Sequence, residues 1–449
     1  MADRPSVSAA PRRASTFHLV FLTYSVICSG AYGLEEMISA TGPGLSIFVM
    51  LALPVLWSIP LSLTCAELSA AHPVEGGYYR WARMAFGDFV GYQAGWLVWL
   101  ANLATNAAFA VLFANYLRMF IPGLDGGWRW AAALLLIWAT TLMNCLGIRL
   151  VGTTSVVLTV LIFLPFLAMT LLGLLQWRYN PLVPFTDPDK TMMHAFGDGL
   201  LIAIWLYSGY EKMTTNAEEV ENPSRAFPIA LGIAVPMAVL SYLIPTVVGL
   251  AATGNWKGWT EAHFSVVAGA VGGPWLAAAM TFGGLISNVC LLMVTILGQS
   301  RLPMVLAEDG LFPPMFGRVS RRWGTPVVSI VVGGVILSAL SRARFTELTG
   351  LFSLVQVLAY VLICAALLKL RARPAAAPGS STFRIPLGRA GLFLMMVPTF
   401  VITLFVIAQR VAPDGVFNLK RTVFDLMVFA SGPLTYLLFR RRRNFSGTR

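Results

Sequence analysis

The sequence has little charge. Asp, Glu, Lys and Arg make up only 12% of the 449 residues, whereas 57% are hydrophobic and the mean hydropathy is +0.73. A soluble globule of this length needs more polar side chains than this to cover its surface. A soluble globular protein is therefore excluded, and the composition indicates an integral membrane protein.

Cysteine is also scarce, and no two cysteines have the spacing of a metal site or of a C-x-x-C motif. All of them fall inside predicted membrane spans, where cysteine is typically a small packing residue. The sequence therefore predicts neither a disulfide framework nor a bound metal. The five cysteines are Cys28, Cys65, Cys145, Cys290 and Cys364.

Catalytic motifs are missing as well. The chain has no H-E-x-x-H, no G-x-S-x-G and no G-x-x-x-x-G-K-[ST], the patterns of metalloproteases, serine hydrolases and phosphate-binding loops. We predict no enzyme activity and no cofactor. The alternative function in the enzyme class is a membrane-embedded enzyme that uses buried acids. The four histidines, His18, His72, His194 and His263, fall at span ends or in loops and are not expected to relay protons.

Long apolar stretches dominate what is present. A helix needs about 20 mostly apolar residues to cross a bilayer, and a window search finds about twelve such stretches. We therefore expect an all-α integral membrane protein, with a cytosolic tail at 1–16. The predicted spans are 17–40, 45–71, 88–120, 128–146, 150–177, 194–217, 225–252, 275–307, 326–340, 345–369, 388–410 and 422–439.

The net charge of +12 is explained by membrane topology. When the chain is threaded through the predicted spans, most Lys and Arg residues fall in loops on the side of the two termini. The positive-inside rule then places both termini in the cytosol, and we expect a multi-pass protein of the plasma membrane. The basic tail at 440–449 can contact anionic membrane lipids, and no nucleic-acid partner is predicted.

Two spans contain glycine-bearing breaks. The first break, Ser29-Gly30-Ala31-Tyr32-Gly33, interrupts the first span, and the second, Ser208-Gly209, interrupts the sixth. Irregular backbone at membrane depth is tolerated only where it is buried in protein or lines a cavity. Two breaks at matching places, each followed by acids, are typical of two inverted halves with a substrate site between them. The alternative is that these glycines only allow close helix packing.

Three loop segments resemble a known family. They are "AELSAAHPVEGGYYRWARMAFG" at 66–87, "AEEVENPSRAFPIAL" at 217–231 and "SRLPMVLAEDGLFPPMF" at 300–316. In sequence, order and loop placement they resemble the cytosolic signatures of the amino acid-polyamine-organocation (APC) superfamily of permeases. The resemblance covers roughly residues 17–440. It implies a leucine-transporter-type 5+5 inverted repeat with discontinuous helices 1 and 6. The ten-helix core would cover 17–371, with halves at 17–177 and 194–371, and two peripheral helices would cover 387–439.

Within that superfamily the chain is most similar to the polyamine uptake branch of plants and protozoa. The stretches "WSIPLSLTCAE", "GYQAGWLVWL", "WTEAHFSVVAGAVGGPWL" and "RRWGTP" carry this similarity. The second break, Ser-Gly-Tyr-Glu, is closer to general amino-acid carriers, and Thr105 stands where the plant branch is expected to have an acid. The resemblance implies a secondary transporter that works by alternating access, and it leaves both amino acids and polyamines open as substrates.

Glu35 and Glu36 directly follow the first break. A half-helix that begins near Leu34 presents a partial positive charge that suits a substrate carboxylate. Two acids in its first turn offset that charge and favour substrates rich in ammonium groups. Each carboxylate costs roughly 2.5 to 3.5 kcal/mol at the centre of a span, so both must face the cavity, pair with a cation or be protonated. Successive residues diverge by about 100° on a helix, so one faces the ligand and the other is structural; the sequence leaves open which.

Glu211 follows the second break in a Gly-Tyr-Glu setting. It resembles the acid that in related exchangers lies under the substrate and takes part in proton coupling. The alternative is a static ion pair with Lys212. The fifth span has no lysine to replace a sodium ion, whereas Thr281 and Ser287 in the eighth could line a sodium site. We expect a proton as the co-transported partner.

Aromatic and amide side chains near the breaks complete the predicted site. The aromatic rings can stack on an alkylammonium chain or can simply pack in the core. Asn102 and Asn106 share a face of the third span. The remaining alternatives are a neutral amino-acid permease or exchanger, and a channel. The predicted substrate-binding residues are Ser29, Gly30, Ala31, Tyr32, Gly33, Glu35, Glu36, Asn102, Asn106, Trp205, Tyr207, Ser208, Gly209 and Tyr210, with Glu211 as the proton-coupling residue.

Overall fold

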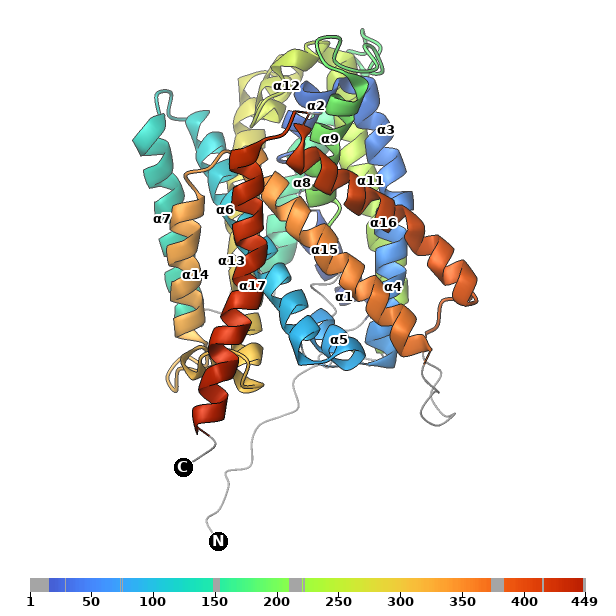
Figure 1. Ribbon diagram of the computed structural model, residues 1–449. Helices are drawn as coiled ribbons and strands as arrows, with labels where there is room; N and C mark the ends of the chain where they lie inside the picture. The colour runs from blue at the N-terminus through green and yellow to red at the C-terminus, as the bar shows by residue number, and fades with distance from the viewer. Residues whose placement is uncertain are drawn as a thin grey trace.

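The structure is a computed structural model, and it describes residues 16–28, 30–72, 74, 76–147, 154–209, 220, 223–372, 383–413 and 416–446. The regular elements of these residues are helices, which form one bundle (Figure 1). The helices are α1 (Thr16–Ile27), α2 (Glu35–Thr41), α3 (Pro43–Leu53), η1 (Pro54–Ser58), α4 (Ile59–Ala71), α5 (Gly77–Phe86), α6 (Asp88–Arg118), α7 (Gly126–Cys145), α8 (Thr154–Leu174), α9 (Met192–Leu206), α11 (Pro223–Thr253), η3 (Trp256–Gly258), α12 (His263–Gly272), α13 (Pro274–Glu308), η4 (Pro314–Gly317), α14 (Val327–Leu340), α15 (Phe345–Arg371), α16 (Arg389–Val411) and α17 (Leu419–Ser446).

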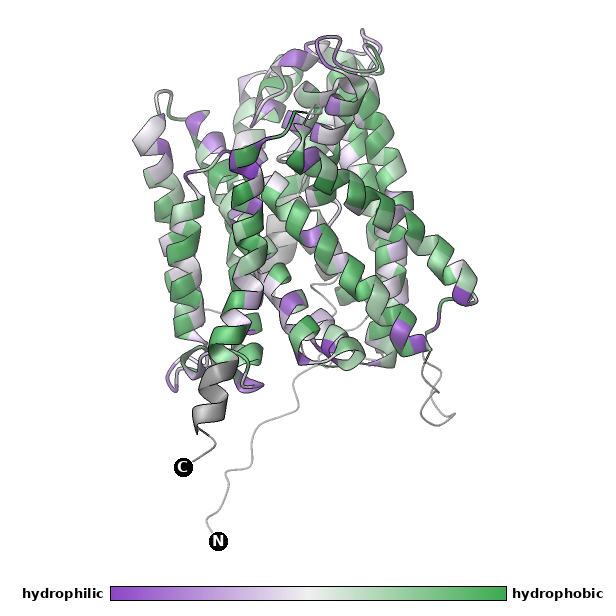
Figure 2. Ribbon diagram, in the orientation of Figure 1, coloured by the Kyte–Doolittle hydropathy of each residue, from purple (hydrophilic) through white to green (hydrophobic). Residues whose placement is uncertain are grey.

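Seven helical stretches of the described chain are long and apolar enough to cross a membrane. Each coincides with a predicted span, and Figure 2 shows hydrophobic residues along the length of the bundle. Two other predicted spans, 194–217 and 326–340, fall on the shorter apolar helices α9 and α14. The seven stretches are Pro43–Ala71, Asp88–Arg118, Arg225–Thr253, Pro274–Glu308, Phe345–Arg371, Arg389–Val411 and Leu419–Phe439.

The helix α6 is the centre of the bundle. In its most apolar window, 89% of the residues are buried, against 28% for α16 and 17% for α17. It packs closely against α13 and α15, while α1 packs against α11. Helices that are apolar all round suit a core position, and a helix with most of its apolar window exposed suits contact with lipid. The last two helices therefore lie at the outside of the bundle.

The first span is broken where the sequence predicts it. Helix α1 ends at Ile27 and α2 begins at Glu35. Gly30 and Gly33 have φ values of +96° and +92°, which L side chains rarely adopt. A Cβ atom on Gly33 would lie 3.0 Å from side-chain atoms of Leu112 and Trp205. Glycine is therefore required both for the turn and for the close approach of this segment to α6 and α9.

The sixth span also stops at its predicted break. Helix α9 ends at Leu206, and Gly209 has a φ of +116°. The second span contains an irregularity that the sequence analysis missed, a π-helical turn over Pro54–Ser58 between α3 and α4. Pro54 and Pro60 remove backbone N–H donors at this place, which explains why the hydrogen-bond ladder changes there.

The two ends of the bundle differ in what covers them. Helices α2 and α12 lie at the upper end in Figure 1, whereas α5 and the end of α17 lie at the lower end. Neither α5 nor α12 is long enough to span a bilayer, so both connect longer helices. We call the end with α2 and α12 the outer end, and the end with α5 the inner end.

Candidate functional site

A small central cavity lies where the two breaks meet. Its volume is about 40 Å³, which is room for about one water molecule. The break after α1 and the end of α9 form one side, and the middle of α6, α11, α13 and α15 form the others. The lining residues are Gly30, Tyr32, Thr105, Phe109, Leu112, Trp205, Leu206, Ser208, Tyr242, Ser287, Asn288, Leu291 and Phe352.

The side chains that line the central cavity are mostly aromatic, apolar or neutral polar. Among its described lining residues there is no carboxylate. The indole N–H of Trp205 donates to the hydroxyl of Thr105 at 2.5 Å, so the ring has a fixed orientation. Helices α1 and α9 both end beside the cavity, and the carboxyl end of a helix carries a partial negative charge. Aromatic faces and helix carboxyl ends are both favourable surroundings for a cation.

An aromatic layer of Trp205, Phe109 and Phe345 borders the central cavity. The ring of Trp205 lies edge-on to that of Phe345, with 5.2 Å between centroids, and its centroid is 5.8 Å from that of Phe109. Gly33 packs against both Trp205 and Phe345. Trp205 and Phe109 line the central cavity, whereas Phe345 directly follows Arg344, which lines a second, larger cavity.

Glu35 is the structural member of the acidic pair. Its side chain is completely buried, and one carboxylate oxygen accepts a hydrogen bond from the backbone N–H of Gly33 at 2.7 Å. The other oxygen accepts a hydrogen bond from the hydroxyl of Tyr116 on α6. The Tyr116 ring in turn lies edge-on to Tyr32, with 5.1 Å between centroids. Glu35 therefore links the first break to α6 and lines neither the central nor the outer cavity.

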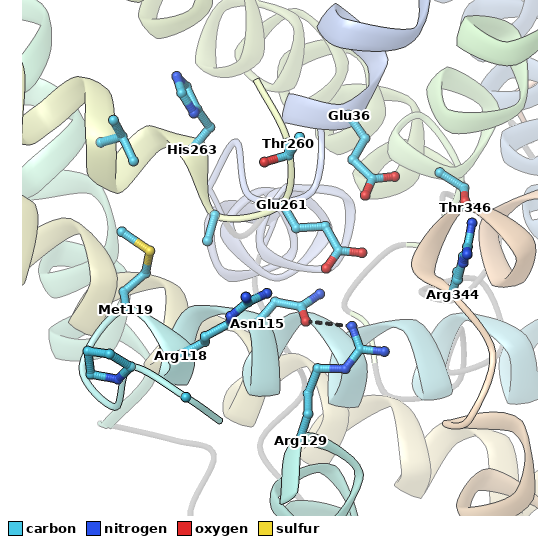
Figure 3. A pocket seen from close by; sticks show the side chains of 14 residues that line it. Glu36, Asn115, Arg118, Met119, Arg129, Thr260, Glu261, His263, Arg344 and Thr346 are labelled. Atoms are coloured by element: carbon cyan, nitrogen blue, oxygen red, sulfur yellow. Dashed lines mark hydrogen bonds between the residues drawn. The ribbon is translucent and has the colours of Figure 1, made fainter. Parts of the chain in front are cut away.

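Glu36 instead faces a larger outer cavity of about 700 Å³. Figure 3 shows its carboxylate and that of Glu261 pointing into the same space, with three arginines around them. Glu36 and Glu261 both line this cavity, so two acidic side chains lie near one another there. The residues that line the outer cavity are Glu36, Asn115, Arg118, Met119, Pro122, Gly123, Arg129, Thr260, Glu261, Ala262, His263, Val266, Arg344 and Thr346.

Burial has opposite effects on two groups of the loop that joins α11 to α12. It raises the pKa of Glu261, although Arg129 and Arg118 oppose this shift. Burial lowers the pKa of the His263 imidazole to about 4, because a charged form loses hydration. His263 is therefore neutral near pH 7, and the charges of the outer cavity come from glutamate and arginine alone.

An ion-pair cluster at the inner end links α5 to the end of α13. Asp309 lies 2.7 Å from Arg83 and 3.4 Å from Arg80, and it accepts a hydrogen bond from the hydroxyl of Tyr79 at 2.6 Å. Arg83 also pairs with Asp88 at 2.7 Å. We call Tyr79, Arg80, Arg83, Asp88 and Asp309 the inner cluster. Its presence, together with the large outer cavity, makes the two ends asymmetric.

Several residues predicted to bind substrate have other partners here. The side chain of Asn106 is bonded to Gln299 and Thr295 and so joins α6 to α13. The hydroxyl of Tyr207 donates to the carbonyl of Met50 at 3.1 Å. These positions serve helix packing in this conformation.

The other predicted positions divide into three groups. Gly30, Tyr32, Trp205 and Ser208 line the central cavity. Ala31, Gly33, Asn102 and Gly209 lie buried near it without being among its lining residues, and the N–H of Gly209 donates to the hydroxyl of Tyr360 at 3.4 Å. Ser29, Tyr210 and Glu211 lie outside the described residues.

Comparison with known proteins identifies the family of this chain. The family model described as "Amino acid permease" matches residues 15–429, which is nearly the whole chain. The chain belongs to the amino acid permease family. It is a multi-pass membrane transporter of small molecules and not an enzyme. The permease is also similar to individual curated proteins over most of its length.

Two plant relatives are similar along both chains. A probable polyamine transporter of Arabidopsis thaliana is 32% identical over 413 residues, which cover 90% of this chain and 81% of the relative. The polyamine transporter PUT1 of Oryza sativa subsp. japonica is 32% identical over 433 residues, which cover 95% of this chain and 79% of the relative. A bacterial relative, an uncharacterized transporter of Legionella pneumophila, is 28% identical over 348 residues, covering 72% of this chain and 74% of its own.

The predicted substrate-binding residues do not include the face of α6 that lines the central cavity of the permease. Thr105, Phe109 and Leu112 are four and three residues apart, the spacing of one helix face. The polar pair Asn102 and Asn106 drew attention to a neighbouring face instead. Asn115, near the end of α6, and Glu261, in the loop before α12, were also missed, because no local sequence pattern marks either of them as lining a cavity.

Proposed function

We propose that the permease is a secondary active transporter of polyamines that works by alternating access and co-transports protons. The observation that carries the substrate class is the hydrogen bond from the Gly33 N–H to Glu35. The amino end of α2 is where a substrate carboxylate would be favourable, and the carboxylate of Glu35 already occupies it. An amine without a carboxylate loses nothing by this arrangement, whereas an α-amino acid loses its partner.

The central cavity supports the same substrate class. Trp205, Tyr32 and Phe109 surround a space at the carboxyl ends of α1 and α9, where an ammonium group is stabilised by aromatic faces and by helix dipoles. The similarity to plant polyamine transporters agrees with this chemistry.

Alternating access is supported by the asymmetry of the two ends. The outer cavity is open, while the inner cluster connects α5 to α13 through Asp309. This is the arrangement expected of an outward-facing state in a transporter with two inverted halves. We propose the architecture of about twelve spans with a 5+5 repeat, with both termini in the cytosol and the plasma membrane as the location.

Proton coupling is assigned to Glu211, which lies outside the described residues. Moving one elementary charge across 100 mV is worth about 2.3 kcal/mol, or roughly 40-fold accumulation. This is sufficient for an importer that collects a dilute amine.

A second candidate is a neutral amino-acid permease, favoured by the absence of a described carboxylate in the central cavity. The experiment that separates the two uses purified protein in liposomes with an imposed pH gradient. Uptake of labelled putrescine, spermidine, arginine, alanine and leucine is measured one compound at a time. Accumulation of the two polyamines supports the proposal, and accumulation of alanine and leucine without polyamines overturns it.

A further inference from the structure

The outer cavity holds opposite charges that face one another without pairing. Glu36 on α2 and Glu261 before α12 lie on one wall, and Arg118, Arg129 and Arg344 lie on the others (Figure 3). In the part of the chain that the structure describes, neither glutamate forms an ion pair with any of these arginines. Arg118 pairs instead with Asp125 at 3.1 Å. Charges of both signs therefore remain available to a molecule in the cavity.

A buried amide adds an unused donor to this space. Asn115 is only 6% exposed, and its carbonyl oxygen accepts a hydrogen bond from Arg129 at 3.3 Å. Its amide nitrogen has no hydrogen-bond partner among the described residues. In Figure 3 this amide points between Glu261 and Arg129. A buried donor without a partner is unfavourable, so a ligand with an acceptor is favoured at this position.

We propose that the outer cavity is a binding site for a zwitterion with one ammonium and one carboxylate group, such as a small α-amino acid. The carboxylate accepts hydrogen bonds from the amide nitrogen of Asn115 and from Arg129. The ammonium group lies against Glu36 and Glu261, whose carboxylates face the same cavity. A cavity of about 700 Å³ has room for such a molecule and several waters.

This site is distinct from the central cavity. Among the described residues, the two cavities have no lining residue in common, and the aromatic layer contacts both sets: Trp205 and Phe109 line the central cavity, and Phe345 directly follows Arg344 of the outer cavity. Arg129 and Arg344 favour a carboxylate in the outer cavity, and Glu36 and Glu261 favour an ammonium group, so a molecule with both groups suits it. A bound zwitterion covers the path to the central cavity from the outside. It therefore inhibits uptake without being transported, whichever amine the central cavity carries.

The test is calorimetric titration of the purified protein in lipid nanodiscs with alanine, alaninamide and propionate. The three molecules have similar size, but alaninamide lacks the carboxylate and propionate lacks the ammonium group. Alanine is expected to bind at least about tenfold more tightly than either, because each of the others loses one charge-assisted contact. Equal binding of alanine and alaninamide, or no binding of alanine, overturns the proposal.

Variants locate the site. Asn115→Asp keeps the side-chain shape and the acceptor for Arg129 but places a negative charge against the ligand carboxylate, and Asn115→Leu removes the donor. Both are expected to weaken alanine binding about tenfold or more, as is Glu261→Gln. Glu308→Gln is the matched control, since Glu308 is exposed at the inner end. Wild-type affinity for alanine in both Asn115→Asp and Glu261→Gln contradicts the assignment.

A transport measurement separates this proposal from the proposed function. External alanine should inhibit uptake of the transported amine, while labelled alanine itself should not accumulate in the liposomes. If alanine accumulates, the claim that the outer site binds alanine without its being transported fails; if it accumulates while polyamines do not, the polyamine assignment of the central cavity fails as well. If alanine neither binds nor inhibits, the outer site fails and the polyamine assignment stands.

Discussion

The backbone N–H of Gly33 donates a hydrogen bond to the carboxylate of Glu35 at 2.7 Å, so the first break in the bundle is closed by an acid from the helix that follows it. The same carboxylate accepts a hydrogen bond from Tyr116 on α6. One acid thus neutralises the amino end of α2 and holds the break against the central helix. Both effects depend on its charge and can be tested by removing it.

Glu35→Gln should alter substrate preference. Glutamine keeps one acceptor oxygen and loses the negative charge, so the amino end of α2 becomes more favourable for a substrate carboxylate. We expect putrescine uptake to fall about tenfold and uptake of neutral amino acids to fall less or to rise. Initial uptake rates in liposomes measure this ratio, with Glu308→Gln as the control. An equal loss for both substrate types would argue that Glu35 acts only on stability.

Trp205→Leu should weaken binding of cationic substrates about tenfold, since a cation–π contact in a desolvated site contributes up to about 2 kcal/mol. Competition for labelled spermidine uptake measures the affinity. Thr105→Val keeps the ring but removes its acceptor, and a smaller effect is expected. Trp138→Leu is the matched control because Trp138 is 42% exposed on α7. Unchanged affinity in Trp205→Leu would exclude the ring from substrate binding.

Glu211→Gln should abolish pH-driven accumulation and leave exchange of substrate intact, because a side chain that cannot titrate cannot couple a proton gradient to transport. Net uptake driven by a pH gradient is compared with counterflow in the absence of a gradient. Acid-stimulated net uptake by this variant at the wild-type rate would remove Glu211 from the coupling mechanism.

Asp309→Asn should loosen the inner end, since Arg80, Arg83 and Tyr79 all contact this carboxylate. The ion pairs are partly exposed, so we expect a loss of about 1 kcal/mol and a shift toward the inward-facing state. Hydrogen exchange of α5 amides reports the opening and should become faster. Glu308→Gln changes the neighbouring acid, which has no described ion pair, and should leave this exchange unchanged. Identical exchange in Asp309→Asn would mean that the inner cluster does not hold the end closed.

The pH dependence of stability should report on Glu261, whose pKa is raised by burial. A raised folded-state pKa means that the folded protein binds more protons than the unfolded chain between the ordinary carboxyl pKa and the raised one. The contribution of this group to stability therefore rises as pH falls through that window. Charged and titratable groups facing it are Glu36, Arg118, Arg129, Arg344 and His263.

The measurement is the thermal unfolding midpoint of wild type and of Glu261→Gln across that window. The difference between the two curves reports on Glu261 and on its interaction with Glu36, because the arginines keep their charge throughout and His263 stays neutral above about pH 4. Wild type should gain stability relative to the variant as pH falls. A pH-independent difference would show that Glu261 keeps its proton at all pH values tested.

The breaks were predictable from sequence because glycine-bearing segments interrupt two otherwise apolar spans at matching places. Gly30, Gly33 and Gly209 all adopt positive φ in the structure. The roles of Glu35 and Glu36 were not predictable, since neighbouring helix residues point in different directions and only the packing of α6 decides which is buried. The face of α6 was equally hidden, because a helix that is buried on nearly every side has no polar face to show its orientation.

The outer cavity is the part of the structure that was least predictable from the sequence. Asn115 and Glu261 are separated by more than a hundred residues and meet only because the loop before α12 folds over the end of α6. No local sequence pattern predicts that these two residues lie close together. Their proximity depends on how α12 packs against α11 and α13.

The size of the central cavity affects how a dissociation constant measured for this permease must be interpreted. A space of about 40 Å³ holds no polyamine, so every substrate must first find, or induce, a wider conformation. The apparent dissociation constant is then the intrinsic constant divided by the fraction of molecules in that wider form. A substitution that widens the cavity in the absence of substrate should tighten binding of all substrates by one common factor. Selectivity among them would stay unchanged, so affinity and selectivity can be engineered separately in this protein.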